Sequence, residues 1–196
     1  MNATALSDHE LVERARKGSE KAYRELLGRY QRPVFSLVYR MVRDREQAED
    51  LAQETFVRVF NNIERYDPAY KFSSWIFKIA TNLTIDWMRR KEVPTVSLDG
   101  SRFATTSDEI EASTITVESR DENPEELLVS KELGSEIELA IGKLRPEYRQ
   151  AIVLRHIEDR PYEEIAQIMA LPLGTVKTYI HRGRNELREM LAHTRV

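Results

Sequence analysis

The segment 93–124 divides this 196-residue chain, because it lacks the large apolar residues that a folded core requires. It contains Pro94, an Asp99-Gly100 turn pair, clusters of Ser and Thr, and many carboxylates. Such a segment buries too little apolar surface to offset the conformational entropy lost on ordering, which predicts a flexible linker. We therefore expect two small domains, residues 1–92 and 125–196, joined by an acidic tether.

Charge is distributed in similar blocks. Residues 93–140 carry 3 Lys and Arg against 12 Asp and Glu, whereas 1–92 carry 17 against 14 and 141–196 carry 10 against 7. The net charge of −3 thus hides two mildly basic blocks around an acidic middle. Because the local field at a docking face governs attraction, this overall acidity does not exclude a nucleic-acid partner.

Several classes of chemistry are disfavoured by residue content. The chain has no cysteine, which excludes disulfides, thiol nucleophiles and zinc sites that use cysteine. The histidines are dispersed and never stand at metal-ligand spacing: His9, His156, His181 and His193. No Gly-rich phosphate loop or nucleophile–base pair is evident, so we expect no metal, no cofactor and no enzymatic activity. No apolar run reaches about 18 residues and no secretory signal is evident, which favours a cytoplasmic protein without stable membrane insertion.

Both outer blocks show the apolar periodicity of amphipathic helices. Glycine and proline are sparse, at seven each, so long helices can run uninterrupted. One apolar stripe lies within 45–63 and another within 74–90, the second following Asp67-Pro68 and capped by Ser73 or Ser74. Periodicity returns from Glu125, and Pro146 suits a first helical turn. The predicted fold class is all-α.

Residues 161–184 have the pattern of a helix-turn-helix. Tyr162–Met169 forms a short amphipathic helix, 170–174 a turn, and Thr175 the cap of a second helix. We expect a shared core of Ile165, Ile168, Val176 and Ile180. The outward face of the second helix is suited to phosphates and base edges: Lys177, Thr178, His181, Arg182 and Asn185. An αα-hairpin with a solvated basic face would have the same spacing, and Ala170 occupies a turn position where a left-handed backbone would favour glycine.

A second cluster surrounds the interruption at Asp67-Pro68. Its aromatic members crowd a loop and the start of the next helix: Tyr66, Tyr70, Phe72 and Trp75. Opposite its apolar stripe that helix presents Lys78, Asn82, Asp86 and Arg89. Stacking rings beside cations and amides suit single-stranded DNA, in which bases are unpaired. At helical spacing, aromatic residues are more typical of a core than of a nucleotide platform, and this holds for Phe72, Trp75, Phe77 and Trp87. We assign Phe77 and Trp87 to the core outright.

Five stretches, in this order, resemble the extracytoplasmic-function group of bacterial sigma factors. They are 47–56 (QAEDLAQETF), 72–82 (FSSWIFKIATN) with Asp86 and Arg89-Arg90, 144–149 (LRPEYR), 165–166 (IA) and 174–177 (GTVK). The likeness covers nearly the whole chain apart from the linker. Tyr179 departs from the pattern, since the family often has arginine there, and Ala170 replaces a usual glycine.

The resemblance implies roles for the first domain, which would correspond to sigma region 2. Asp50, Gln53 and Glu54 would face core RNA polymerase. The residues implied to read and open the −10 element are Tyr66, Tyr70, Lys71, Phe72, Lys78, Asn82, Asp86, Arg89 and Arg90.

The second domain would correspond to region 4. The residues implied to read the −35 element are Thr175, Lys177, Thr178, Tyr179, His181, Arg182 and Asn185. Tyr148 and Ile152 would lie near the polymerase flap, and the acidic linker would occupy channels that later hold RNA. The implied partners are core RNA polymerase, promoter DNA and an anti-sigma factor.

Two other functions fit parts of this pattern. A free-standing helix-turn-helix regulator would bind duplex DNA alone, with a salt-dependent affinity. A helical adaptor would carry the helix-turn-helix by coincidence. A sigma factor differs from both, because it initiates transcription specifically only with core enzyme.

Overall fold

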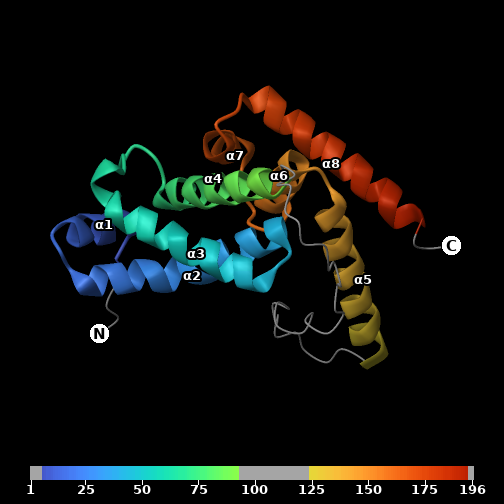
Figure 1. Ribbon diagram of the computed structural model, residues 1–196, viewed down its shortest axis with the longest axis horizontal. Coiled ribbons are helices and arrows are strands. Elements are labelled where there is room, and N and C mark those ends of the chain that lie inside the picture. Colours follow the sequence, from blue (N-terminus) through green and yellow to red (C-terminus); the bar gives the residue numbers. More distant parts are fainter. Residues whose placement is uncertain (1–5, 93–123, 194–196) are drawn as a thin grey trace, which may run out of the picture.

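The computed structural model describes residues 6–92 and 124–193, so the predicted linker lies outside the described residues except for Pro124. Within those two ranges the chain forms eight α-helices, one short 3-10 helix and no strand (Figure 1). The all-α prediction is therefore confirmed.

Four helices form the N-terminal group: α1 (Asp8–Arg16), α2 (Glu20–Val42), α3 (Arg45–Asn61) and α4 (Phe72–Glu92). Side-chain caps satisfy the free N–H groups at three of their starts. Ser7 and Glu10 form a capping box on α1, Ser19 accepts from the N–H of Ala22, and Asp44 accepts from the N–H of Gln47. The starts of α1 to α3 are thus encoded locally.

Four more helices form the C-terminal group: α5 (Pro124–Lys143), α6 (Pro146–His156), α7 (Tyr162–Met169) and α8 (Leu173–His193). Pro146 lies in the first turn of α6, as predicted. Helices α6 and α8 cross closely at Gly183, where an added Cβ would lie 2.8 Å from Cγ1 of Ile152. Glycine is needed there because a methyl group would displace a buried side chain.

Two predicted helix starts are wrong. Helix α4 begins at Phe72, so Ser73 and Ser74 lie in its first turn with buried side chains rather than acting as caps. Helix α8 begins at Leu173, and Thr175 lies within its first turn, where its N–H donates to the carbonyl of Pro172 at 2.9 Å. Serine is a favoured capping residue in an isolated helix. Here Phe72 is buried in the core, and α4 begins at that residue.

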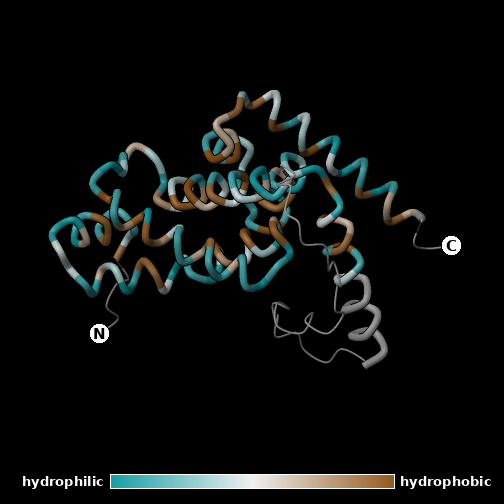
Figure 2. Tube along the Cα trace, viewed as in Figure 1, coloured by the Kyte–Doolittle hydropathy of each residue, from teal (hydrophilic) through white to brown (hydrophobic). Residues whose placement is uncertain are grey.

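A single apolar core connects the two groups. It contains Val34 and Leu37 of α2, Phe77 of α4 and Ile152 of α6, all at most 2% exposed. Along the helices of both groups, apolar and hydrophilic segments alternate, as amphipathic packing requires (Figure 2). The units that were expected to be separate domains therefore pack against each other in this structure.

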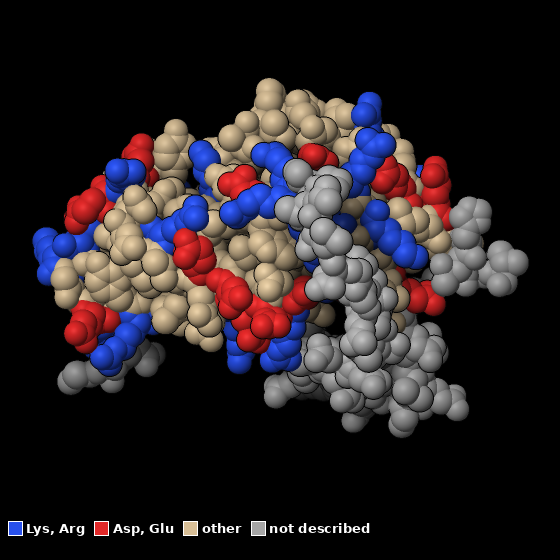
Figure 3. Space-filling view, in the orientation of Figure 1, with Lys and Arg blue, Asp and Glu red and all other residues tan. Residues whose placement is uncertain are grey.

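Buried polar contacts reinforce this packing. Arg40, 7% exposed, pairs through Nε with Glu138 Oε1 of α5 at 2.9 Å. Arg149 of α6 donates to the backbone carbonyl of Met41 in α2. On the face in Figure 3, basic and acidic side chains are interspersed rather than gathered into one basic stripe. Over the part of the chain that the structure describes, no helix has both the length and the apolar character needed to cross a membrane.

Candidate nucleic-acid interface

The loop between α3 and α4, residues 62–71, is ordered by its own hydrogen bonds. It contains the short 3-10 helix η1 (Ile63–Arg65). The Asp67 carboxylate accepts from the N–H of Ala69 at 2.9 Å, and the Tyr66 hydroxyl donates to the carbonyl of Tyr70 at 2.6 Å. Burial raises the pKa of Tyr66, so its hydroxyl stays a donor at neutral pH.

An open hollow of about 330 Å³ lies where this loop meets α4, with Gln167 of α7 on its rim. Its lining combines aromatic rings, cations and hydrogen-bonding groups: Arg65, Tyr66, Asp67, Tyr70, Ser74, Trp75, Lys78 and Gln167. The fold thus brings three predicted −10 residues, Tyr66, Tyr70 and Lys78, to one place. The planar rings and cations of the loop and α4 suit an unpaired base and its phosphate.

The aromatic residues differ in how much of each is accessible. Tyr70 is 51% exposed, whereas Tyr66 and Phe72 are 5% and 2% exposed. The Phe72 ring packs on the rings of Tyr30, Tyr66 and Trp75, with 5.3 to 5.8 Å between ring centroids. Phe72 therefore has a packing role in this structure, and its direct contact with DNA stays a prediction. Tyr70 and the half-buried Trp75 are better placed to stack on a base.

Phe77 and Trp87, both predicted to be core residues, differ in burial. Phe77 is fully buried, which confirms the prediction. Trp87 is only partly buried against the core, and Nζ of Lys91 lies 4.9 Å from its ring centroid. Part of the indole therefore remains at the surface, where a cation covers it.

The outward face of α4 carries the remaining predicted −10 residues. Their side chains are exposed: Lys78, Asn82, Asp86, Arg89 and Arg90. Asp86 lies 3.8 Å from Arg89, and its backbone carbonyl accepts from Arg90 at 3.2 Å. Pairs at this exposure stabilise little, so the arginines can exchange them for phosphates.

The helix-turn-helix is formed by α7 and α8, and α7 has the predicted bounds. Its predicted core is confirmed, since Ile165, Ile168, Val176 and Ile180 are at most 1% exposed. Ala170 ends α7 in the left-handed region, at φ 53° and ψ 43°. The helix-turn-helix pattern predicts glycine at this position, and the alanine there adopts the strained left-handed conformation.

The predicted −35 residues divide into two groups. Lys177, Thr178, His181 and Arg182 are exposed on α8, and Arg182 Nη1 lies 3.4 Å from the Tyr148 hydroxyl. The other three are half-buried: Thr175, Tyr179 and Asn185. Tyr179 packs on Tyr148, with 5.4 Å between ring centroids. Tyr148 and Ile152, expected near the polymerase flap, are 8% and 2% exposed, so neither presents a large surface here.

The predicted polymerase-facing residues lie together on α3. Asp50, Gln53 and Glu54 are exposed, and Glu54 pairs with Arg58 at 2.7 Å. Val57, one turn beyond Gln53, is 52% exposed and was missed by the sequence reasoning. An apolar residue at i+4 from an exposed glutamine was the available signal. A single exposed apolar residue is ordinary on a protein surface, so polymerase docking by this face stays a prediction.

Helix α7 packs against α4 beside the loop, and Glu164 joins the two. Its buried carboxylate, 7% exposed, pairs with Lys71 at the end of the loop and lies 3.7 Å from Nη1 of Arg160. Ser74 also approaches it, at 3.5 Å. Lys71 was predicted to contact DNA, but here it is engaged by the second half of the chain. The −10 face and the helix-turn-helix are therefore packed against each other.

Comparison with known proteins agrees with this geometry. Residues 26–93 match the family model for sigma-70 region 2, and residues 135–187 match that for sigma-70, region 4. The ECF RNA polymerase sigma factor SigW of Bacillus subtilis is 40% identical over 184 residues, covering 92% of this chain and 94% of that protein. This chain belongs to the ECF sigma factors. The Escherichia coli K12 sigma-E factor is 34% identical over 184 residues and 93% of each chain.

Solved structures share the fold of this sigma factor. CnrH, in complex with the cytosolic domain of CnrY, superposes with a TM-score of 0.67 at 21% identity, over 96% of this chain and 99% of that one. RpoE of Bartonella quintana, in complex with the anti-sigma factor NepR, gives 0.62 at 19% identity, over 88% and 98%.

Replacing Ala170 by glycine should stabilise the sigma factor by about 0.5–1 kcal/mol, because glycine adopts a positive φ without a Cβ clash. Urea unfolding measures the change in the free energy of unfolding. Ala166→Gly, in the interior of α7, is the matched control and should destabilise by about 1 kcal/mol. Destabilisation by both variants would contradict the left-handed assignment of Ala170.

Replacing Glu164 by glutamine should loosen the two halves of the sigma factor. Lys71 and Arg160 lose their charged partner, at a cost of about 2 kcal/mol. Small-angle X-ray scattering should report a larger radius of gyration than for the wild type. Glu163→Gln removes the same charge from an exposed neighbour and should leave the radius unchanged. Equal radii for the wild type and Glu164→Gln would contradict a role for this carboxylate in holding the halves together.

Proposed function

We propose that this ECF sigma factor directs RNA polymerase to promoters through a division of labour between its two halves. In the first half, α3 docks on core polymerase, while α4 and the 62–71 loop capture unpaired bases of the −10 element. In the second half, α8 reads the −35 element as duplex. The observation that carries the proposal is the meeting of Tyr70, Trp75 and Lys78 around one base-sized hollow, in a chain that also carries a helix-turn-helix.

The spacing of the promoter elements implies that the two halves separate on DNA. Positions −10 and −35 lie about 25 base pairs apart, which is about 85 Å of duplex at 3.4 Å per base pair. Helix α7 packs on α4 in this structure, so the closed form cannot reach both elements. The 31 residues 93–123 span at most roughly 100 Å when extended, a length that permits the separation. Lys71 would then exchange Glu164 for a phosphate.

The remaining assignments follow from the family. Sigma factors are non-catalytic transcription factors, so we propose that this chain has no enzymatic activity and works in the cytoplasm with RNA polymerase. CnrH and RpoE were solved with CnrY and the anti-sigma factor NepR, respectively. We propose that an anti-sigma factor likewise holds this chain inactive.

The acidic linker, by our proposal, enters polymerase channels built for RNA, since its carboxylates suit a basic groove.

Reconstituted transcription with purified core polymerase on a promoter library tests this function. We expect initiation from a defined subset of promoters only when the chain is present. A free-standing regulator would instead bind specific duplex DNA alone. A stable complex with core that gives no promoter-specific initiation would overturn the proposal.

Replacing Asn82 by alanine should reduce discrimination at the −10 element by about 1–3 kcal/mol, because one base-reading amide is lost. Core affinity should be unchanged, since Asn82 is on α4 and the proposed polymerase face is on α3. Transcription from promoters with single −10 substitutions measures the discrimination. Gln31→Ala, which removes an exposed amide from α2, is the control. Loss of core affinity in Asn82→Ala would refute the assignment of this face.

Replacing Arg182 by alanine should weaken −35 binding uniformly across sequences and reduce the slope of log K against log salt by about 1, as expected for one lost phosphate contact. Binding of the holoenzyme to a −35 duplex at several salt concentrations measures the slope. Tyr148→Phe removes the hydroxyl near Arg182 but keeps its charge, so the slope should stay that of the wild type. An unchanged slope in Arg182→Ala would place the guanidinium away from phosphate.

A further inference from the structure

Arg16, in the last turn of α1, reaches the 62–71 loop from outside residues 26–93, the segment matched by the region 2 family. Its guanidinium makes three hydrogen bonds to loop carbonyls. Nε donates to Ile63 at 3.2 Å, and Nη2 donates to Glu64 at 3.4 Å and Tyr66 at 2.5 Å. The side chain is 18% exposed; its bonds to Ile63 and Tyr66 are partly buried, whereas its bond to Glu64 is exposed to water.

The receiving backbone needs such a partner. The 3-10 helix η1 is only three residues long, and runs this short have poor internal hydrogen-bond geometry. Two backbone bonds support it, from the N–H of Arg65 to the carbonyl of Asn62 at 2.8 Å and from the N–H of Tyr66 to the carbonyl of Ile63 at 3.2 Å. The Arg16 fork adds donors to carbonyls at a helix end, where intrahelical partners run out. The Arg16 guanidinium also lies 6.0 Å from the Tyr66 ring centroid and 3.8 Å from the Glu64 carboxylate.

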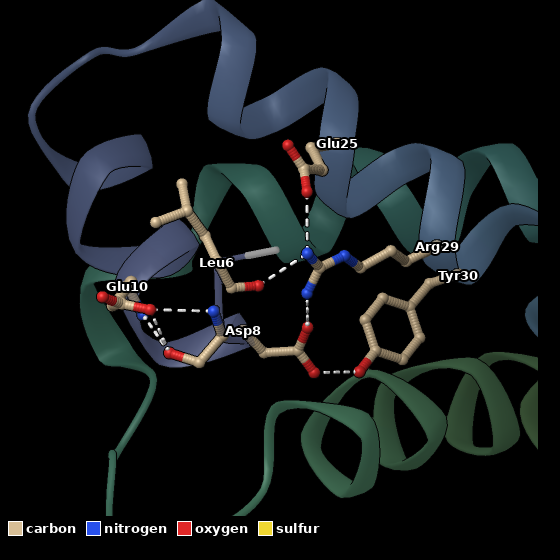
Figure 4. Close-up of polar contacts among 7 residues, drawn as sticks. Leu6, Asp8, Glu10, Glu25, Arg29 and Tyr30 are labelled. Atoms are coloured by element: carbon tan, nitrogen blue, oxygen red, sulfur yellow. Dashed lines mark hydrogen bonds and ion pairs between the residues drawn. The ribbon is translucent and has the colours of Figure 1, made fainter. Parts of the chain in front are cut away.

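Helix α1 is in turn fixed to α2 at its other end (Figure 4). Asp8 accepts from Arg29 Nη1 at 2.8 Å and from the hydroxyl of Tyr30. Arg29 also donates to the carbonyl of Leu6 at 2.6 Å. Burial, together with the Asp8 carboxylate, raises the pKa of Tyr30, so this hydroxyl remains a donor. The Tyr30 ring then meets Phe72, the first residue of α4, with 5.3 Å between centroids.

The loop is thus held at both ends by contacts that begin at α1. Arg16 holds its entrance at Ile63 to Tyr66, and Asp8 acts through Tyr30 on Phe72 just beyond its exit. Arg16 is absent from the lining of the hollow, whereas Arg65 and Tyr66 line it. We propose that Arg16 is a positioning residue that pre-orders the 62–71 loop for capture of −10 bases; this inference rests on the function proposed above.

The chemistry calls for arginine rather than lysine. A planar fork of five N–H donors can reach several carbonyls at once, whereas an ammonium is a compact point charge. A loop that is already ordered loses less entropy when a base enters the hollow. Loosening the loop should therefore weaken single-strand capture without changing the docking of α3 on polymerase.

The test uses the full chain assembled with core polymerase and the −10 element of a promoter that the wild type initiates from. Binding of a single-stranded −10 oligonucleotide is compared with a scrambled one, and core affinity is measured separately. We expect Arg16→Ala to lose about tenfold in −10 affinity and Arg16→Lys to lose less, both with wild-type core affinity. Arg14→Ala, an exposed arginine on the same helix, should behave as the wild type.

Hydrogen exchange on the free chain provides a second readout that does not depend on transcription. In Arg16→Lys, the amides of residues 63–71 should exchange faster, while those of α2 and α3 keep wild-type protection. Unchanged loop exchange in that variant, or equal losses of −10 and core affinity in Arg16→Ala, would overturn the positioning role. A wild-type holoenzyme that does not prefer the −10 oligonucleotide would instead overturn the proposed function, leaving the exchange result interpretable.

Discussion

The packing of the two halves of this sigma factor depends on the contacts that the buried Glu164 carboxylate makes. A buried charge is tolerated only when it is paired and hydrogen-bonded. Its nearest partners come from both halves of the chain, Lys71 and Ser74 from the first and Arg160 from the second. Arg160 also lies 4.7 Å from the Phe77 ring centroid, which ties the same cluster to the core. These pairs therefore add to the shared apolar core in holding α7 on α4.

This packing affects both the stability of a small chain and the accessibility of its proposed DNA contacts. Domains of this size bury a limited share of their apolar surface, and this chain has no disulfide to compensate. Sharing one core between the halves adds burial that neither would have alone. The same contacts engage Lys71 and bring α7 against the hollow, so the most stable packing is one in which a proposed DNA contact is occupied. By the proposed function, stability of the free chain and access to promoter DNA are therefore in competition.

The parts that could be predicted are those governed by local rules. Helical periodicity and scarce Gly and Pro predicted the all-α class, and the bounds of α7 and its buried isoleucines followed from spacing alone. The left-handed backbone at Ala170 could likewise be predicted, because the turn geometry of a helix-turn-helix constrains one backbone position. The starts of α4 and α8 were missed, since Ser and Thr cap well in isolation but tertiary packing set the first turns. Burial of Tyr66 was also missed, because periodicity does not distinguish a stacking ring from a core ring, whereas the burial of Phe72 agrees with the core that helical spacing favoured.

By itself, the sequence determined the class of fold, the helix-turn-helix and membership in the sigma factor pattern, all of which reside in residues close along the chain. Only the tertiary structure decided that Lys71 meets Glu164 and that Arg16 reaches the carbonyls of Ile63 and Tyr66. These partners stand 93, 47 and 50 residues apart. Helical periodicity does not indicate which distant residue a charged side chain will contact. Such pairs form only when the core brings together helices that are far apart in the sequence.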